Sequence, residues 1–451
     1  MTNLKFYNTL SRNKEVFEPL DPSNIRIYAC GPTVYDRIHV GNARPVVLFD
    51  LLVRLLRHHY DRVTYVRNIT DVDDKINARA TEEGISIRQL TEGTTNAFHE
   101  DCLALGSAKP DIEPRATDHI DDMIAMITTL IDKGHAYAAE GHVLFQVSSM
   151  EDYGQLSRRS LDELIAGARV DVAPFKREAA DFVLWKPSTE GQPGWDSPWG
   201  VGRPGWHIEC SAMSAAFLGE SFDIHAGGLD LIFPHHENEI AQSRCAHGHE
   251  MMAKTWMHNG YVTVDGEKMS KSLGNFTTVE AVLKDHEGEA IRYALLTAHY
   301  RAPLDFSIGG VREAKSALDT LYRAVADAPE ESAEIDGLVL AALGDDLNTP
   351  NALARLHELA RMANKGDAAA KSSLKASAQL MGLLSQDADA WFKGKAKGNN
   401  HDDAAIDDAI LARQTAKANK DFAEADRIRD ALAADGIVLE DKADGTIWRR
   451  K

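Results

Sequence analysis

Four residues far apart in the sequence have side chains that could bind one metal ion together. Cys30, Cys210, His235 and Glu239 offer two thiolates, an imidazole and a carboxylate. These are the ligand types that Zn²⁺ accepts in tetrahedral sites. Their spacing matches no C-x-x-C pattern, so both cysteines could equally be buried thiols and the histidine a surface residue. The sequence therefore raises a zinc site as a hypothesis, which depends on where the fold brings these residues.

Two other short segments, one early and one late, are suited to phosphate chemistry. His39, Gly41 and Asn42 lie at the expected start of a helix, where backbone N–H groups and the helix dipole attract anions. Lys268 and Lys271 lie in a glycine-bounded segment, and their ammonium groups could neutralise a departing pyrophosphate. Taken alone, each motif also occurs as an ordinary helix cap or as a solvated basic turn.

The elements expected around these residues place them at one edge of a sheet. Residues 25–29 and 63–66 are rich in β-branched and aromatic side chains and are predicted to be strands. Residues 43–59 have the apolar spacing of a helix packed into a core. Strand, loop, helix and strand in this order indicate a parallel sheet, whose carboxyl edge is where such folds bind ligands. We therefore expect Cys30 and His39 at this edge.

The middle of the chain is predicted to be an insertion. Residues 120–131 have the pattern of an amphipathic helix, and residues 142–147 that of a strand. Between residues 185 and 206 the sequence becomes rich in Pro, Gly and Trp. Such composition favours long, ordered loops over a continuation of the parallel sheet.

The parallel sheet is expected to resume with a strand over residues 221–225. Pro234 suits the first position of a helix, so His235 and Glu239, four residues apart, are predicted to share one helix face. After about residue 310 the apolar spacing predicts helices, beginning with a buried stripe between Ala314 and Val325.

The last fifty residues are predicted to form a separate small module. A basic, glycine-containing linker over residues 393–400 precedes a helix, a turn and a short hairpin. Six cations could contact phosphates or could simply be a solvated helix face: Arg413, Lys417, Lys420, Arg427, Arg449 and Arg450. Trp448 could stack on a base, but we favour a place for it in the core of the module.

Composition sets the limits of these hypotheses. The chain has 451 residues, which predicts about two to four domains. Its net charge of −19 argues against a passive coat on a polyanion, but a local basic face could still bind nucleic acid. Only four cysteines occur, too few and too scattered for a disulfide framework. No apolar run is long enough to cross a bilayer, and no signal-peptide core is present, so a cytoplasmic location is expected.

Two motifs together resemble those of class I aminoacyl-tRNA synthetases. His39-Val40-Gly41-Asn42 is similar to their HIGH motif, and Lys268-Met269-Ser270-Lys271-Ser272 matches their second motif without a change. Val40 replaces Ile and Asn42 replaces the second His. Asn keeps a hydrogen-bond donor but carries no charge, so positioning rather than acid–base work is expected of it. Within this class the chain resembles the cysteinyl-tRNA synthetase family over residues 30–36, 67–75, 205–211, 234–239, 345–350 and 420–426.

The resemblance implies a role for each candidate residue. It assigns zinc to Cys30, Cys210, His235 and Glu239, and the amino-acid pocket to Thr33, Thr70 and Trp206. It assigns ATP binding to His39, Gly41, Asn42, Asp230, Lys268 and Lys271. Of these, His39, Asn42, Lys268 and Lys271 are expected to act in catalysis, with Mg²⁺ accompanying ATP.

The fold implied by the resemblance is α/β. It comprises a Rossmann-like parallel-sheet catalytic domain with an insertion, an α-helical bundle and a small C-terminal α+β module. The expected boundaries are 1–117 and 205–250 for the two catalytic halves, 118–204 for the insertion, 251–310 for the KMSKS-loop and stem-contact region, 311–392 for the bundle and 401–451 for an anticodon-binding module.

The implied activity is ATP-dependent attachment of L-cysteine to tRNA(Cys), by a chain that is expected to be monomeric and to bind no membrane. Zinc would select the substrate thiol over the hydroxyl of serine, which an apolar pocket separates poorly. We therefore expect no separate editing domain. Two rivals remain. One is a cysteine ligase of thiol biosynthesis, against which the anticodon-like tail counts. The other is a non-catalytic tRNA-binding relative, against which the intact second motif and the full ligand set count.

Overall fold

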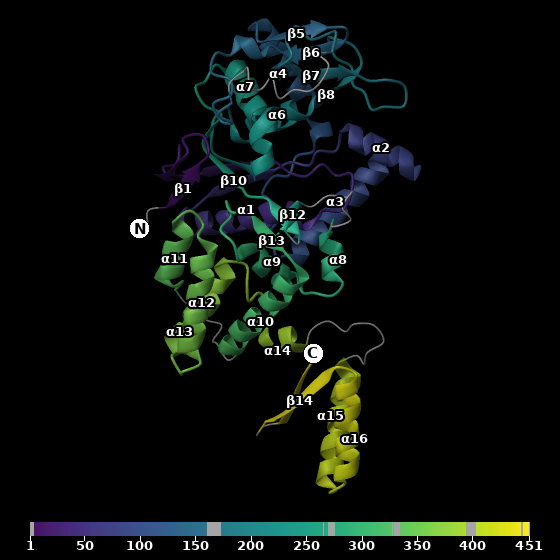
Figure 1. Ribbon diagram of the computed structural model, residues 1–451, viewed down its shortest axis with the longest axis vertical. Helices are drawn as coiled ribbons and strands as arrows, with labels where there is room; N and C mark the ends of the chain where they lie inside the picture. Colours follow the sequence, from purple (N-terminus) through teal and green to yellow (C-terminus); the bar gives the residue numbers. More distant parts are fainter. Residues whose placement is uncertain are drawn as a thin grey trace. The chain divides into compact units, whose positions relative to one another are not determined.

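The computed structural model describes residues 4–159, 173–264, 266–268, 276–326, 328, 334–393, 403–442 and 445–450 (Figure 1). The chain forms two compact units. The first contains Met1–Lys315, Ile335–Leu356 and Leu380–Leu383, and the second contains Ser316–Glu334, His357–Gln379 and Leu384–Lys451.

The first unit is built around the predicted parallel sheet. Its four strands are β3 (Ile25–Ala29), β4 (Val63–Arg67), β9 (Phe222–Gly228) and β10 (Ala253–Asn259), in the order β10-β9-β3-β4 and all parallel. Helix α1 (Val40–His59) connects β3 to β4, and its apolar side is fully buried. The helix begins three residues earlier than predicted, because His39 caps it by accepting a hydrogen bond from the Asn42 N–H.

The predicted insertion forms a second sheet of antiparallel strands. Helix α4 (Ile120–Asp132) and β6 (His142–Phe145) were predicted, and β6 pairs with β5 (Ala136–Ala139) and β7 (Phe182–Pro187). Strands β7 and β8 (Gly202–Pro204) lie in the Trp-rich segment, where Trp185 is fully buried in the core. Figure 1 shows α4, α6 (Trp206–Leu218) and α7 (Glu237–His247) beside these strands. The segment expected to be loops is therefore partly strand.

One predicted helix boundary is wrong. Helix α7 begins at Glu237 and not at Pro234. Phe233 has extended backbone angles (φ −142°, ψ 131°), so residues 232–236 form a separate distorted turn. His235 and Glu239 nevertheless lie together, with His235 Nε2 3.0 Å from Glu239 Oε1. The expected i,i+4 proximity is therefore confirmed.

The remaining elements of the described chain are short or helical. Before the sheet come β1 (Lys5–Asn8) and β2 (Asn13–Val16), followed within the first half by α2 (Asp74–Glu83) and α3 (Ile87–Ala104). After β10 come β11 (Val262–Val264), β12 (Glu267–Lys268), α8 (Val279–Leu283), α9 (Gly288–Leu296) and β13 (Leu304–Phe306). The later helices are α10 (Ile308–Val325), α11 (Gly337–Gly344), α12 (Thr349–Ala363), α13 (Ala368–Leu380) and α14 (Ala388–Lys393). The helical character predicted beyond residue 310 is confirmed.

A buried ion pair fastens α1 to α9 inside the first unit. The Arg292 guanidinium donates to Asp50 Oδ2 at 2.6 Å, and both side chains are almost inaccessible to solvent. Arg292 also donates to the carbonyl of Met381, and the Asp50 carboxylate accepts from Arg54. Because buried charges are tolerated only when paired and hydrogen-bonded, this network fixes α1, whose first turn faces the cavity described below.

The end of the chain forms a small module within the second unit. Helices α15 (Asp403–Ala418) and α16 (Phe422–Ala434) lie side by side and are followed by a hairpin of β14 (Ile437–Lys442) and β15 (Gly445–Arg450). The sequence predicted one helix here, and the structure has two. Trp448 is buried and donates from Nε1 to Asp407 at 2.7 Å, which confirms its place in the core.

Candidate active site and metal centre

Six potential metal ligands meet at the carboxyl edge of the parallel sheet. We call Cys30, Cys210, His225, His235, His236 and Glu239 the donor cluster. Cys30 is the first residue after β3, and His225 lies in the adjacent strand β9. Cys210 comes from α6, Glu239 from α7, and the two remaining histidines from the turn between β9 and α7.

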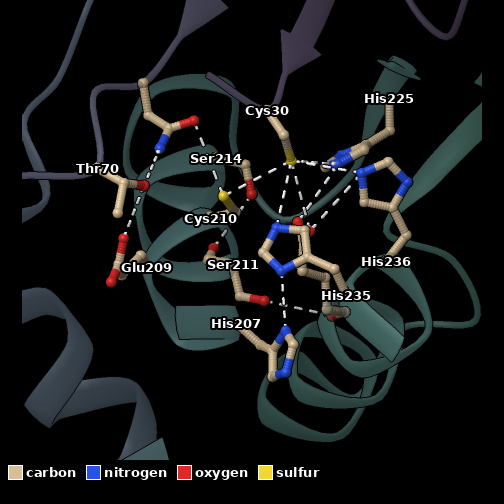
Figure 2. Close-up of polar contacts among 12 residues, drawn as sticks. Cys30, Thr70, His207, Glu209, Cys210, Ser211, Ser214, His225, His235 and His236 are labelled. Atoms are coloured by element: carbon tan, nitrogen blue, oxygen red, sulfur yellow. Dashed lines mark hydrogen bonds and ion pairs between the residues drawn. The ribbon is translucent and has the colours of Figure 1, made fainter. Parts of the chain in front are cut away.

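The thiol of Cys30 is at the centre of the donor cluster (Figure 2). Its Sγ lies 3.7 Å from Cys210 Sγ and 3.6 Å from Glu239 Oε1. The three histidine Nε2 atoms lie 3.4–3.6 Å from the same sulfur. Two sets of four have all their donor atoms within 4.8 Å of one another, and both contain Cys30 and Glu239. One set adds Cys210 and His235, the residues raised by the sequence, and the other adds the two histidines that the sequence analysis missed.

Burial opposes ionisation at four members of the donor cluster, Cys30, His225, His236 and Glu239. It raises the pKa values of Cys30 and Glu239 well above their usual ranges, and it lowers those of His225 and His236 well below theirs. A hydrogen bond from Cys30 lowers the pKa of Cys210 to about 7. Cys30 and Glu239 by themselves therefore favour their neutral forms, and a divalent cation would reverse this preference by stabilising the anionic ligands.

The donor set fits a metal ion. Glu239 Oε2 is buried and accepts no hydrogen bond from any described residue, and His225 Nε2 lies 3.3 Å from it. Such an orphaned carboxylate oxygen among two thiols and three imidazoles is costly unless a cation satisfies it. Thiolate, imidazole and carboxylate in one buried cluster suit Zn²⁺ by ligand type.

Outer residues hold the histidines in place. Nδ1 of His235 lies 2.8 Å from Nδ1 of His207, and Nδ1 of His236 lies 2.7 Å from Nε2 of His258. Trp206 stacks on the His235 ring with centroids 4.0 Å apart. In metal sites such partners fix the tautomer and orientation of the ligating ring. In both rings Nε2 is thereby left to face Cys30, as Figure 2 shows.

A cavity of about 410 Å³ opens from the donor cluster along the sheet edge. Its lining includes Cys30, Thr33 and Trp206 at one side, and His39, Gly41, Asn42 and Asp230 further along. The structure thus brings most of the predicted site residues to one cavity. A sulfur of the donor cluster and the start of α1 face the same space.

One residue predicted for the amino-acid pocket does not line this cavity. Thr70 is buried behind its wall and is not among the lining residues, and its hydroxyl donates to Glu209 Oε2 at 3.0 Å. The backbone of Lys268 ends strand β12, which pairs with β11. Lys271, with the rest of its motif from Met269 on, lies outside the described residues.

The loops after β3 and β4 are joined beyond the ends of the strands. Thr33 and Thr70 form a parallel bridge, and the Gly31 N–H donates to Asn68 Oδ1 at 2.8 Å. A Cβ atom at Gly31 would lie 1.6 Å from the carbonyl oxygen of Asn68, so only glycine permits this approach. These contacts hold the loop that contains Cys30 against the loop that contains Thr70.

Family models match three consecutive parts of the chain. Residues 16–316 match the catalytic domain described as "tRNA synthetases class I (C)", residues 339–387 match the DALR domain, and residues 403–449 match the cysteinyl-tRNA ligase anticodon binding domain. Among the described residues, no helix is long and apolar enough to span a membrane.

Known proteins resemble the chain over its whole length. It is 63% identical to a cysteine–tRNA ligase of Rhodospirillum centenum and 61% identical to one of Paramagnetospirillum magneticum, each alignment covering 99% of both chains. A methionyl-tRNA synthetase structure from Mycobacterium tuberculosis shares the fold at 15% identity with a TM-score of 0.56, covering 80% of this chain and 89% of that one. A putative arginyl-tRNA synthetase from Campylobacter jejuni has the same TM-score at 14% identity, covering 81% of this chain and 94% of the other. The chain therefore belongs to the cysteine–tRNA ligase family of class I aminoacyl-tRNA synthetases.

Proposed function

We propose that the protein activates L-cysteine with ATP and transfers it to the 3′ end of tRNA(Cys). The observation that carries this proposal is the double position of Cys30, which belongs to the donor cluster and also lines the cavity that contains His39 and Asn42. A metal that binds the thiol of cysteine and a helix start that binds the phosphates of ATP would then lie on the same cavity, where the two substrates react. Full-length similarity to cysteine–tRNA ligases supports the same substrates.

Zinc is the proposed metal, held by Cys30, Cys210, His235 and Glu239. When bound, it would coordinate the thiolate of the substrate, a contact that the protonated hydroxyl of serine makes poorly. Discriminating cysteine from serine by about 10⁴-fold requires about 5.5 kcal/mol, more than a packing difference the size of one methylene provides. Cys30 is partly exposed and lines the cavity, whereas the other five members of the cluster are buried.

The amino-acid pocket is proposed to use Thr33, Thr70 and Trp206. Thr33 and Trp206 line the cavity, and Trp206 also stacks on the ligand His235. Thr70 lies behind the residues that line the cavity. The hydrogen bond from its hydroxyl to the buried Glu209 keeps the loop after β4 in place. Burial raises the pKa of Glu209 well above its usual range, which favours a neutral carboxyl as the partner of this hydroxyl.

In the first proposed step, the carboxylate of cysteine attacks the α-phosphorus of ATP in line, and pyrophosphate leaves. His39 and the first N–H groups of α1 donate to phosphate oxygens as charge builds on them, and Lys268 and Lys271 neutralise the leaving group, with Mg²⁺. Gly41 and Asn42 keep the helix start close to the phosphates, and Asp230 is proposed to bind the ribose.

In the second proposed step, a terminal ribose hydroxyl of the tRNA attacks the carbonyl carbon of the adenylate, and AMP leaves. No protein nucleophile is required, because positioning and charge stabilisation supply the catalysis. Residues 401–451 are proposed to bind the anticodon, a role supported by the family match over residues 403–449. We further propose that the enzyme acts as a monomer in the cytoplasm.

Cysteine-dependent ATP–pyrophosphate exchange, measured on zinc-loaded protein without tRNA, tests the first step. We expect strong exchange with cysteine and almost none with serine. Charging of tRNA(Cys) with radiolabelled cysteine then tests the acceptor. Exchange without tRNA charging would favour a small-molecule acceptor such as an amino sugar, and absence of exchange with either amino acid would contradict the proposed activity.

A further inference from the structure

The segment that follows the second motif is joined to the first motif. His39 and Thr278 form an antiparallel bridge, although they lie in distant parts of the sequence. Two backbone hydrogen bonds of 3.0 Å flank this pair, from the Val40 N–H to the Thr277 carbonyl and from the Val279 N–H to the Ile38 carbonyl. Backbone hydrogen bonds therefore connect the segment that begins α1 directly to the segment that begins α8.

A ring contact accompanies this backbone connection. The ring of Phe276 meets that of His39 edge-on, with centroids 4.9 Å apart and planes at 72°. Both residues line the cavity. Edge-to-face contacts of this kind are directional, so they restrict the rotation of a ring as well as burying it.

Two further contacts leave the His39 ring little freedom. The Asn42 N–H donates to His39 Nδ1 at 3.3 Å, so the proton of the neutral imidazole lies on Nε2. A Cβ atom at Gly41 would lie 2.8 Å from two ring atoms, so the ring rests directly against the backbone there. Phe276 adds the T-shaped ring contact on another side. The helix cap sets the tautomer, and Phe276 sets the tilt of the ring.

We propose that Phe276 is a positioning residue for adenylate formation, which acts by holding the His39 ring in the orientation that donates to the phosphate of ATP. This inference rests on the proposed function and adds a residue to its machinery. Phe276 itself exchanges no proton and carries no charge, so its whole effect passes through His39. A displacement of about 1 Å in such a donor can cost about 100-fold in rate.

Exchange kinetics on a set of variants test this inference. Phe276→Leu removes the ring edge, and we expect it to lower kcat for cysteine-dependent exchange by about 10- to 100-fold with KM for cysteine unchanged. Phe276→Tyr keeps the ring edge and should retain most of the activity. Phe217→Leu is a matched control, because Phe217 makes a similar edge contact with His119 (5.1 Å, 80°) far from this helix start in the sequence.

A double-mutant cycle separates positioning from a general loss of packing. In a His39→Ala background, Phe276→Leu should cause no further loss of kcat, since the residue through which it acts is already absent. Equal losses in both backgrounds, or full activity of Phe276→Leu, would overturn the inference.

Imidazole ¹⁵N NMR gives a readout that needs no activity. The His39 signals, assigned by their loss in His39→Ala, should shift in Phe276→Leu and stay unchanged in Phe217→Leu. Unshifted signals in Phe276→Leu would contradict the positioning role even if the protein were inactive. Absence of exchange in the unmodified chain would instead count against the proposed function, so the two failures are distinguishable.

Discussion

The donor cluster and the C-terminal module differ in how far their carboxylates are paired within the chain. In the donor cluster, Glu239 has a buried oxygen that accepts no hydrogen bond from a described residue. In the module, Arg413 and Lys417 share the carboxylate of Asp441, and Arg450 pairs with Asp403. The cluster offers ligands to a cation from outside, whereas in the module several cations are already paired with carboxylates of the chain itself. A count of charged residues in the sequence does not reveal this difference.

Loss of a donor should have the largest effect. Cys30→Ala removes the sulfur on which the whole donor cluster converges, so bound zinc should fall from about one ion per chain to almost none. Cysteine-dependent exchange should fall by more than the 10- to 100-fold that loss of an outer partner causes. Elemental analysis measures the metal, and Cys245→Ala, a half-buried thiol outside the cluster, is the control. Unchanged metal content in Cys30→Ala would show that the donor cluster does not hold the zinc.

Two buried arginines should differ in their contributions to stability. Arg292→Met removes one of the two arginines that pair with the buried Asp50 and leaves Arg54, so we expect a cost of about 3 kcal/mol. Arg413→Met leaves Asp441, whose side chain is 48% exposed, so about 1 kcal/mol is expected. Hydrogen exchange followed by mass spectrometry reports the two losses separately, through peptides from α9 and α15. Equal losses would show that both networks are buried to the same degree in solution.

The pH dependence of stability should have opposite signs at two carboxyl groups, Asp101 in α3 and Asp441 in the C-terminal module. Burial raises the pKa of Asp101 in α3 to about 6, with Arg37 opposing the shift and Glu280 and Glu100 adding to it. Its folded pKa lies above the unfolded value of about 3.9, so its contribution is present below pH 4 and is lost as the pH rises towards 6. After allowance for partial solvation, we expect a loss of about 1–2 kcal/mol.

Asp441 should behave in the reverse sense. Hydrogen bonds from Arg413, Lys417 and Thr446 hold its pKa well below the usual range. Its contribution is therefore present above the unfolded pKa of about 3.9 and is lost as the pH falls below that value. Thermal unfolding between pH 3 and pH 7 should show that Asp101→Asn removes the first dependence and Asp441→Asn the second. If the contributions of Asp101 and Asp441 to stability changed with pH in the same direction, this prediction would be contradicted.

Binding of tRNA should show the smallest effect. Within the described part of the chain, Lys420 and Arg449 are the two of the six candidate cations that have no ion pair, and both are exposed. Arg449→Glu should weaken binding of tRNA(Cys) and reduce the slope of log affinity against log salt by about one. Arg427→Glu, at a cation already paired with Glu424, should change the slope less. Unaltered affinity of Arg449→Glu would remove Arg449 from the interface.

Local patterns were enough to predict much of the first unit. Short-range periodicity predicts strands β3 and β4, helices α1 and α4, and the parallel pairing of the two strands, all of which the structure confirms. Short-range patterns do not predict that Cys30 and Cys210 lie close together. Their proximity depends on the pairing of β9 with β3, two strands separated by a long insertion. Here the resemblance to a family supplied what spacing could not.

The residues that sequence reasoning missed had weak local signals. His225 lies in a central strand buried on both faces, so no alternation of polar and apolar residues marks it. His236 follows His235 directly, and neighbouring side chains on a helix point in different directions, so a face that contains His235 and Glu239 does not single out His236. In the structure His236 Nε2 lies 3.4 Å from Cys30 Sγ.

The close approach of Gly31 to Asn68 has a consequence for the thermodynamics of substrate recognition. Fixing the backbone of one residue costs about 1–2 kcal/mol of conformational entropy. The loops that contain Cys30 and Thr70 are already bound to each other through the Gly31 N–H and the bridge at Thr33. This wall is rigid before cysteine arrives. Binding therefore loses little entropy to loop ordering, and more of the free energy of the thiol contact remains available as selectivity for sulfur.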